Sequence, residues 1–166
     1  MKELLMATVL TLSPAHAAGS PTQAGTAGTT VKVYFAKGFG IPGKLVPVTR
    51  TAPHRGVARF AVEQLIAGPT AKERARGLHS ELAGALRGRS TCGADFTVKI
   101  AKGTATLRFC RTVMGNGIGS DARVLNMIGT TLKQFATVKK VVALEKNGRC
   151  LFDQTDRGTS CLTGRE

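Results

Sequence analysis

The chain has 166 residues, and its 24 lysines and arginines against 10 aspartates and glutamates give a formal net charge of +14. This length suffices for one domain and is too short for two typical ones. Such an excess attracts anionic partners over long range, whereas a need for solubility would produce the same excess, so the charge leaves both interpretations open. With no Trp and a single Tyr, the sequence lacks the aromatic platform on which bases stack, which argues against nucleic-acid binding.

Residues 1–17 have the pattern of a signal peptide. The apolar run Leu4–Leu12 precedes Ala15-His16-Ala17, a small-x-small cleavage site. Lys2 is offset by Glu3, so the positive start of such segments is weak, and a soluble N-terminal helix is the alternative. Cleavage after residue 17 predicts a secreted, extracytoplasmic product. No later apolar run approaches the ~20 residues of a membrane-spanning helix, so we expect no transmembrane segment.

Two strands are expected at the start of the folded domain. Residues 18–30 are small, polar and uncharged, a composition typical of a flexible linker. Val31, Val33 and Phe35 then alternate with polar residues and predict a half-buried strand. Glycines between positions 38 and 43 break the chain, and a second short strand follows over residues 45–51.

A first helix is expected after these strands. Its apolar residues at helical spacing are Ala58, Ala61, Val62 and Leu65. The pair Gly68-Pro69 predicts where it stops, because glycine accepts the left-handed backbone of a helix end and proline cannot continue the helix.

Residues 96–110 predict a β-hairpin. Apolar side chains alternate at positions 96, 98 and 100 and again at 105, 107 and 109, and Lys102-Gly103 supplies a two-residue turn between them. In this register the apolar positions face one another. Cys110 then lies opposite Asp95 and close to Cys92.

Four cysteines in an exported chain favour two disulfides over a metal site. The hairpin register pairs Cys92 with Cys110, which leaves Cys150 with Cys161 to staple a tail of residues 149–166. Each bridge would close a loop of ~10 to 20 residues and contribute on the order of 3 kcal/mol in the chain-entropy model. Zinc is the alternative, but the cysteines lack Cys-x-x-Cys spacing and the three histidines do not lie at zinc-site distances from them. We therefore expect no metal ion.

The glycine-rich residues 115–119 predict a loop before a second helix. Ser120 is the expected N-cap, and Asp121 follows where a negative charge is favoured by the helix dipole. The expected buried stripe of this helix consists of Leu125, Ile128, Leu132 and Phe135. Residues 138–144 return as a strand.

The order of these elements predicts an α+β fold. An antiparallel sheet of about four to five strands would carry two helices on one face, since hairpins connect neighbouring strands without crossover helices. The predicted core consists of Leu65, Ile66, Leu125, Ile128, Leu132 and Phe135 packed against Val33, Val98, Leu107 and Val141.

Five passages occur in an order that is typical of a known family: VKVYFAKG, LVPVTR, AVEQLIAGPTAKERARGLHSEL, VKIAKGTATLRF and LNMIGTTLKQFATVKKVVALEKNG. Residues 31–148 thereby resemble a GerMN domain, the extracytoplasmic module named after a spore germination and sporulation protein. The resemblance implies a fold similar to the ring-building motifs of envelope assemblies and a non-enzymatic scaffold or interaction role, linked to sporulation, germination or cell-wall complexes. It supplies no cofactor and no catalytic residue. Three features depart from the family: a cysteine-bearing insertion at residues 85–94, the tail after residue 148, and the lack of a lipid-modifiable cysteine.

A group of basic residues is the candidate partner-binding surface. Its members on the first helix, just before it and in the segment that follows are Arg55, Arg59, Lys72, Arg74 and Arg76. They are expected to form one positive face, which would attract an anionic envelope protein or an anionic wall polymer. Ordinary solvation of a basic surface is the alternative.

A secreted basic hydrolase, similar to a ribonuclease or acting on the cell wall, is the alternative from another class. His54 and His79, with Glu63 or Glu73 and nearby arginines, are residue types that carry out general acid-base cleavage. A surface histidine is the simpler interpretation of His79, and Ser80 beside it lacks the context of a nucleophile elbow. We expect no enzymatic activity.

Overall fold

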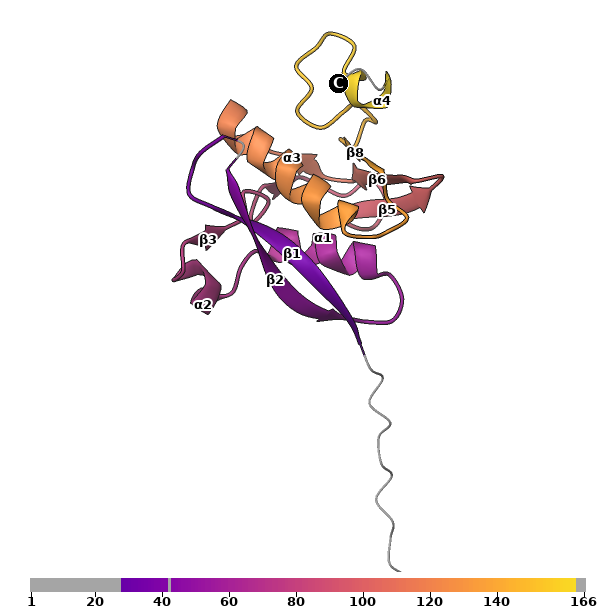
Figure 1. The fold of residues 1–166 in the computed structure, drawn as a ribbon. Helices are drawn as coiled ribbons and strands as arrows, with labels where there is room; N and C mark the ends of the chain where they lie inside the picture. Colours follow the sequence, from indigo (N-terminus) through magenta and orange to yellow (C-terminus); the bar gives the residue numbers. More distant parts are fainter. Residues whose placement is uncertain (1–27, 42, 164–166) are drawn as a thin grey trace, which may run out of the picture.

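The computed structural model describes residues 28–41 and 43–163 (Figure 1). The expected signal peptide and residues 18–27 of the expected linker lie outside the described residues. Within the described part, no helix is both long and apolar enough to cross a membrane. The elements in chain order are β1 (Thr29–Lys37), β2 (Lys44–Ala52), α1 (Val57–Ala67), α2 (Ala71–Arg74), β3 (Leu78–His79), β4 (Leu86–Arg87), β5 (Phe96–Ala101), β6 (Thr104–Phe109), β7 (Thr112–Val113), α3 (Ile118–Lys133), β8 (Lys140–Leu144) and α4 (Ser160–Thr163).

The first two strands form a long antiparallel hairpin, and β3 pairs with the other edge of β1. The side chains of Val31, Val33 and Phe35 are buried because alternate residues of a strand point to the same face. β1 begins at Thr29, so the last two residues of the expected linker belong to the strand. The register also sets the two lysines that end the hairpin, Lys37 and Lys44, directly opposite each other.

Helix α1 packs against β1 and ends where the sequence predicts. It buries Ala61, Val62 and Leu65. The backbone of Gly68 takes a φ of 79°, and its N–H donates to the carbonyl oxygen of Gln64. Only glycine adopts this left-handed conformation without steric cost, so the residue following Ala67 ends the helix.

Strands β5 and β6 form the predicted hairpin in the predicted register. Phe96 lies opposite Phe109 and Val98 opposite Leu107. The turn residues 102 and 103 both have positive φ, as a two-residue turn of this hand requires. The backbone N–H of Cys110 donates to the carbonyl oxygen of Asp95 at 2.8 Å, and a disulfide joins residues 92 and 110 with their Cα atoms 5.7 Å apart.

The expected single antiparallel sheet is wrong in two respects. The strands form separate sheets of order β2-β1-β3, β4-β7 and β5-β6-β8. In addition, β8 runs parallel to β6. The 16 residues of α3 span about 24 Å and carry the chain back to the starting end of the sheet, so β8 enters in the same direction as β6.

The two long helices lie between the two three-stranded sheets. α1 and α3 contact each other and both contact β1, while α1 also contacts β5 and α3 contacts β8. In Figure 1 the hairpin of β1 and β2 passes in front of α1, and α3 lies in front of β5 and β6. The two helices therefore bury apolar side chains on both of their sides. The sheet that contains the β1–β2 hairpin covers one side, and the sheet of β5, β6 and β8 covers the other.

Half of the ten predicted core residues are buried, four more (Ile66, Val98, Phe135 and Val141) are partly buried against the same cluster, and one is exposed. Val33, Leu65, Leu107 and Leu132 are each fully buried, and Ile128 is 1% exposed. The exception on α3 is Leu125, which is 40% exposed, while Val124 and Met127 are buried in its place. With 100° between successive helical residues, this stripe passes beside position 125.

The start of α3 also differs from the prediction. The helix begins at Ile118, its N-cap residue is Gly117 with a φ of 89°, and Ser120 lies buried inside the first turn. Asp121 does belong to the first turn, and its carboxylate accepts a hydrogen bond from the backbone N–H of Asn116 at 3.1 Å. This carboxylate thus satisfies a backbone donor just before the start of the helix.

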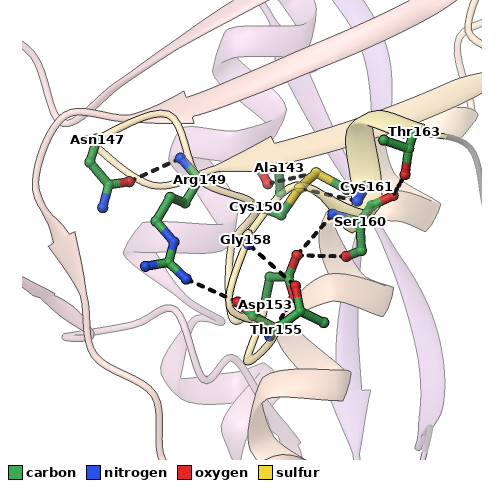
Figure 2. The surroundings of a disulfide bond; sticks show 10 residues. All are labelled: Ala143, Asn147, Arg149, Cys150, Asp153, Thr155, Gly158, Ser160, Cys161 and Thr163. Carbon is green, nitrogen blue, oxygen red and sulfur yellow. Dashed lines mark hydrogen bonds between the residues drawn. A yellow bond between two sulfur atoms is a disulfide. The ribbon is translucent and has the colours of Figure 1, made fainter.

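The residues after β8 fold back over the end of this strand and are closed by a disulfide between Cys150 and Cys161, the predicted second pair (Figure 2). The carboxylate of Asp153 holds this segment together by accepting bonds from the backbone N–H groups of Thr155 and Ser160, both at 2.9 Å, and from the Ser160 hydroxyl at 2.7 Å. Hydrogen bonds from Thr155 and Ser160 favour the charged form and hold the pKa of Asp153 well below its usual range. The tail is thus an ordered cap on β8.

Candidate partner-binding site

The five basic residues predicted to share one face fall into two groups. Arg55 and Arg59 lie just before and within the first turn of α1, whereas the other three, Lys72, Arg74 and Arg76, lie in or directly after α2. The 11 residues of α1 place its two ends about 16 Å apart. Figure 1 shows α2 and β3 together at one side of the molecule, beyond the C-terminal end of α1.

Arg59 is engaged within the domain. Its guanidinium lies 2.8 Å from the carboxylate of Glu63, one turn along α1, and 5.8 Å from the ring centroid of Phe96. Both members of the ion pair are about half exposed, so the pair is of the kind that contributes little stability.

Arg74 lines a surface hollow with two lysines that sequence reasoning missed. The hollow has a volume of about 670 Å³, and among the described residues its charged lining consists of Lys37, Lys44 and Arg74, with no carboxylate. Phe39 and His79 provide its aromatic lining. We refer to these five residues as the cationic hollow. Like charges directly opposite in a hairpin destabilise it, so the pairing of Lys37 with Lys44 is a cost that a bound anion would remove.

A second ion pair fixes the helix that presents Arg74. The guanidinium of Arg50 donates to both carboxylate oxygens of Glu73 in α2, at 2.8 and 2.7 Å. The same carboxylate closes a capping box, accepting from the backbone N–H of Thr70 at 2.8 Å. These hydrogen bonds, that of Arg50 foremost, outweigh burial and lower the pKa of Glu73 to about 2. A helix of four residues is thereby held in one position, and Arg74 adds a bond from its guanidinium to the Pro69 carbonyl at 2.5 Å.

Three large apolar side chains stand exposed: two in the β1–β2 loop, where Phe39 also lines the cationic hollow, and one at the start of α3. Phe39 is 80% exposed, Ile41 67% and Ile118 74%. Ile41 lies against Gly119 at the start of α3, where a Cβ would meet its side chain at 3.1 Å. We call these three residues the loop patch. Exposed apolar groups beside charges are typical of surfaces that bind proteins.

A buried arginine of α3 holds Phe39 of the loop patch in position. Arg123 of α3 is 7% exposed, its Nε donates to the carboxylate of Glu81, and its Nη1 donates to the carbonyl oxygen of Phe39 at 3.0 Å. Its guanidinium also lies 5.7 Å from the centroid of the Phe39 ring. A single side chain therefore joins α3 to the β1–β2 loop and sets the position of Phe39.

His79 belongs to the same cluster. Its ring stacks on that of Phe39 with 4.9 Å between centroids, and its Nε2 lies 3.3 Å from the carboxylate of Glu81. Among the described residues, the His79 Nε2 and one Glu81 oxygen, Oε2, are buried without a hydrogen-bond partner. This geometry gives His79 a role in supporting the loop that carries Phe39.

The two histidines of the hydrolase hypothesis do not share a site. His79 lies on β3 opposite Ala36, whereas His54 follows the end of β2, which pairs with Thr29 at the other end of β1. The seven residues between Ala36 and Thr29 correspond to about 23 Å along the strand. A mechanism that uses one of these histidines as acid and the other as base is therefore wrong for this fold.

Comparison with known proteins agrees with this architecture. A solved structure titled "Tandem GerMN domains of the sporulation protein GerM from Bacillus subtilis" is 22% identical, with a TM-score of 0.53 over 82% of this chain and 48% of that one. The structure titled "First GerMN domain of the sporulation protein GerM from Bacillus subtilis" is 24% identical, with a TM-score of 0.52 over 74% of this chain and 86% of that one. The chain spans about half the length of the tandem structure. These likenesses establish a shared fold.

No curated protein matches the chain. The family model described as "Germane: Sporulation and spore germination" matches residues 32–148, from β1 to the turn after β8. This range contains both larger sheets, both long helices and the cationic hollow, and it leaves out the disulfide-closed tail. The chain belongs to the Germane family of sporulation and spore germination, and it shares its fold with the GerMN domains of GerM.

Proposed function

We propose that this protein is an exported, non-enzymatic binding module that docks an acidic envelope protein through the cationic hollow and the adjoining loop patch. The observation that carries the proposal is the meeting of Lys37, Lys44 and Arg74 from three segments of the chain around a hollow with no carboxylate. The expected export signal and the family's link to sporulation and germination are consistent with an assembly role outside the cytoplasm.

A protein fits this site better than a wall polymer does. Phe39 is almost fully exposed beside the three cations, and interfaces between proteins are enriched in such aromatic anchors surrounded by polar groups. A phosphate-rich polymer would use the charges and leave the apolar side chains without a partner. Lys72 and Arg76 flank Arg74 in the chain and would extend the same positive surface.

The test compares two probes: a short peptide rich in glutamate and leucine, and poly(glycerol phosphate), which lacks apolar side chains. Charge reversal by Lys44→Glu with Arg74→Glu is expected to weaken peptide binding by about tenfold or more. Phe39→Ala is expected to weaken the peptide and leave the polymer unchanged. The matched control, Lys99→Glu with Lys146→Glu, makes the same change in net charge away from the hollow.

Salt gives an independent measurement. The Debye length is about 8 Å at physiological ionic strength, so contacts with these exposed cations should weaken steeply as salt rises. If both charge-reversed proteins bound the peptide equally, the positive surface would serve solvation alone. Stronger binding of the polymer, insensitive to Phe39→Ala, would replace the protein partner by a wall polymer.

A further inference from the structure

The outer edge of β8 is paired along only half of its length. β8 is the last strand of the sheet β5-β6-β8, and the tail covers its C-terminal half in antiparallel fashion. There the N–H of Leu151 donates to the carbonyl of Ala143 at 2.9 Å, and the N–H of Glu145 donates to the carbonyl of Arg149 at 2.8 Å. Residues 143 and 145 thus direct their backbone groups outward.

Val141 must face the same way. Backbone groups of alternate residues in a strand point to the same edge, so the N–H and C=O of Val141 point outward, as those of Ala143 do. Continuing the pairing of Leu144 with Cys150 would bring Asp153 opposite Val141. The N–H of Asp153 instead donates to the carbonyl of Cys150 in a turn, so it does not complete the pairing.

Phe152 is the residue at which the tail leaves the edge. Its φ is 59°, a left-handed conformation that is uncommon and unfavourable for a bulky side chain. One residue earlier, Leu151 still pairs with β8. The turn therefore stops the tail where another strand would begin, and no strand among the described residues 28–41 and 43–163 pairs with the first half of the β8 edge.

The open edge borders a groove between α3, β8 and the tail, with a volume of about 910 Å³. Its apolar lining includes Leu125, Val141 and Phe152. Leu125 lies beside the buried stripe of α3, is 40% exposed and places an apolar side chain in this groove. Lys133, Lys139 and Lys140 also line it, against a single carboxylate, Asp153, whose oxygens are bonded within the tail.

We propose that this groove binds an extended, acidic segment of another protein, which adds as a strand to the outer edge of β8 beside Val141. Backbone bonds would supply affinity, and alternate side chains would choose between the apolar lining and the lysines. A second copy of this edge would set the lysines of one chain against those of the other, which is unfavourable. The chain's own residues 18–27 carry no acidic side chain and do not match the charge of the groove.

The experiment uses three synthetic peptides and the whole protein. The first alternates valine and glutamate, the second replaces glutamate with lysine, and the third is the first with alternate backbone nitrogens methylated. Binding is measured by fluorescence anisotropy, and hydrogen exchange by NMR reports the amides of Val141 and Ala143. The acidic peptide is expected to bind and to slow exchange at Val141, whereas the amide of Ala143, which lies opposite Leu151 of the tail, serves as the reference. The lysine peptide and the methylated peptide are each expected to bind more weakly, by about tenfold or more. The first loses its charge pairing with the lysines of the groove, and the second loses hydrogen bonds to the strand edge.

Two charge variants locate the peptide. Lys133→Glu with Lys139→Glu is expected to weaken binding, whereas Lys44→Glu with Arg74→Glu, in the cationic hollow, is expected to leave it unchanged. Weaker binding by Lys44→Glu with Arg74→Glu, and unchanged binding by Lys133→Glu with Lys139→Glu, would place the peptide in the hollow. That result would overturn strand addition while leaving the proposed function intact. Equal binding of the methylated peptide, or unchanged exchange at Val141, would also overturn it.

Discussion

The ion pair between Arg50 and Glu73 allows a quantitative test of how α2 is held. Arg50→Ala removes both bonds to a carboxylate whose side chain is 11% exposed and leaves that charge with the Thr70 bonds alone. Removing one partner of a buried pair costs about 3 to 5 kcal/mol, and hydrogen bonds to charged groups contribute about 1.5 to 3 kcal/mol. Since both side chains retain some exposure, we expect a loss of about 2 to 3 kcal/mol at pH 7.

The penalty should depend on pH with a definite sign. The pKa of Glu73 is lowered from 4.5 to about 2, so its stabilising contribution is complete above 4.5 and is lost as the pH falls through about 2. The difference between the wild-type protein and Arg50→Ala should therefore shrink as the pH falls from about 5 towards 2. Urea unfolding with both disulfides intact, at several pH values in this window, measures the difference.

Arg59→Ala is the matched control. It also removes an arginine from an ion pair, but its partner Glu63 is about half exposed and lies one turn away on the same helix. We expect at most about 0.5 kcal/mol at any of these pH values. Equal losses for the two arginine variants, or a loss at Arg50 that does not change with pH, would contradict the assigned role of the Arg50–Glu73 pair.

Three further predictions follow from the packing. Leu132→Ala should destabilise by about 2 to 5 kcal/mol in urea unfolding, whereas the exposed Leu125→Ala should cost about 1 kcal/mol or less, and similar values would mean that the helix is rotated from the position described. Replacing Cys150 and Cys161 together with alanine should lower the free energy of unfolding by about 3 kcal/mol, and peptide mapping without reduction should first find these two linked. Arg123→Met should speed amide exchange in the β1–β2 loop and leave exchange in the β5–β6 hairpin unchanged; uniform acceleration would indicate a global loss of stability instead.

Local patterns in the sequence predicted the parts of the fold that depend on neighbours along the chain. The alternation around Lys102-Gly103 specifies a hairpin because side-chain direction and turn length fix the register together. That register brought Cys110 beside Asp95 and so predicted its disulfide partner. Gly68 predicted the end of α1 because its conformation is set by the residue itself.

Features that depend on distant segments could not be predicted in this way. The direction of β8 is decided by the crossover through α3, because the apolar pattern of β8 itself is compatible with a parallel or an antiparallel strand. The cationic hollow combines Lys37, Lys44 and Arg74, which lie far apart in the chain. A signal was present: two lysines flank the glycine-rich break between the first two predicted strands, and they face each other in the structure.

The facing lysines at the end of the first hairpin imply that binding and stability oppose each other there. Their repulsion costs about 0.2 to 1 kcal/mol in the free protein, so Lys44→Glu should raise the melting temperature while it removes an anion-binding group. A bound acidic partner would relieve the same repulsion. Any ligand at 100 times its dissociation constant adds about 2.7 kcal/mol to the stability of the folded state. Thermal unfolding in the presence of candidate envelope proteins would therefore identify the partner by the rise in melting temperature that it causes. A rise that is lost in the Lys44→Glu protein arises from binding at the hollow.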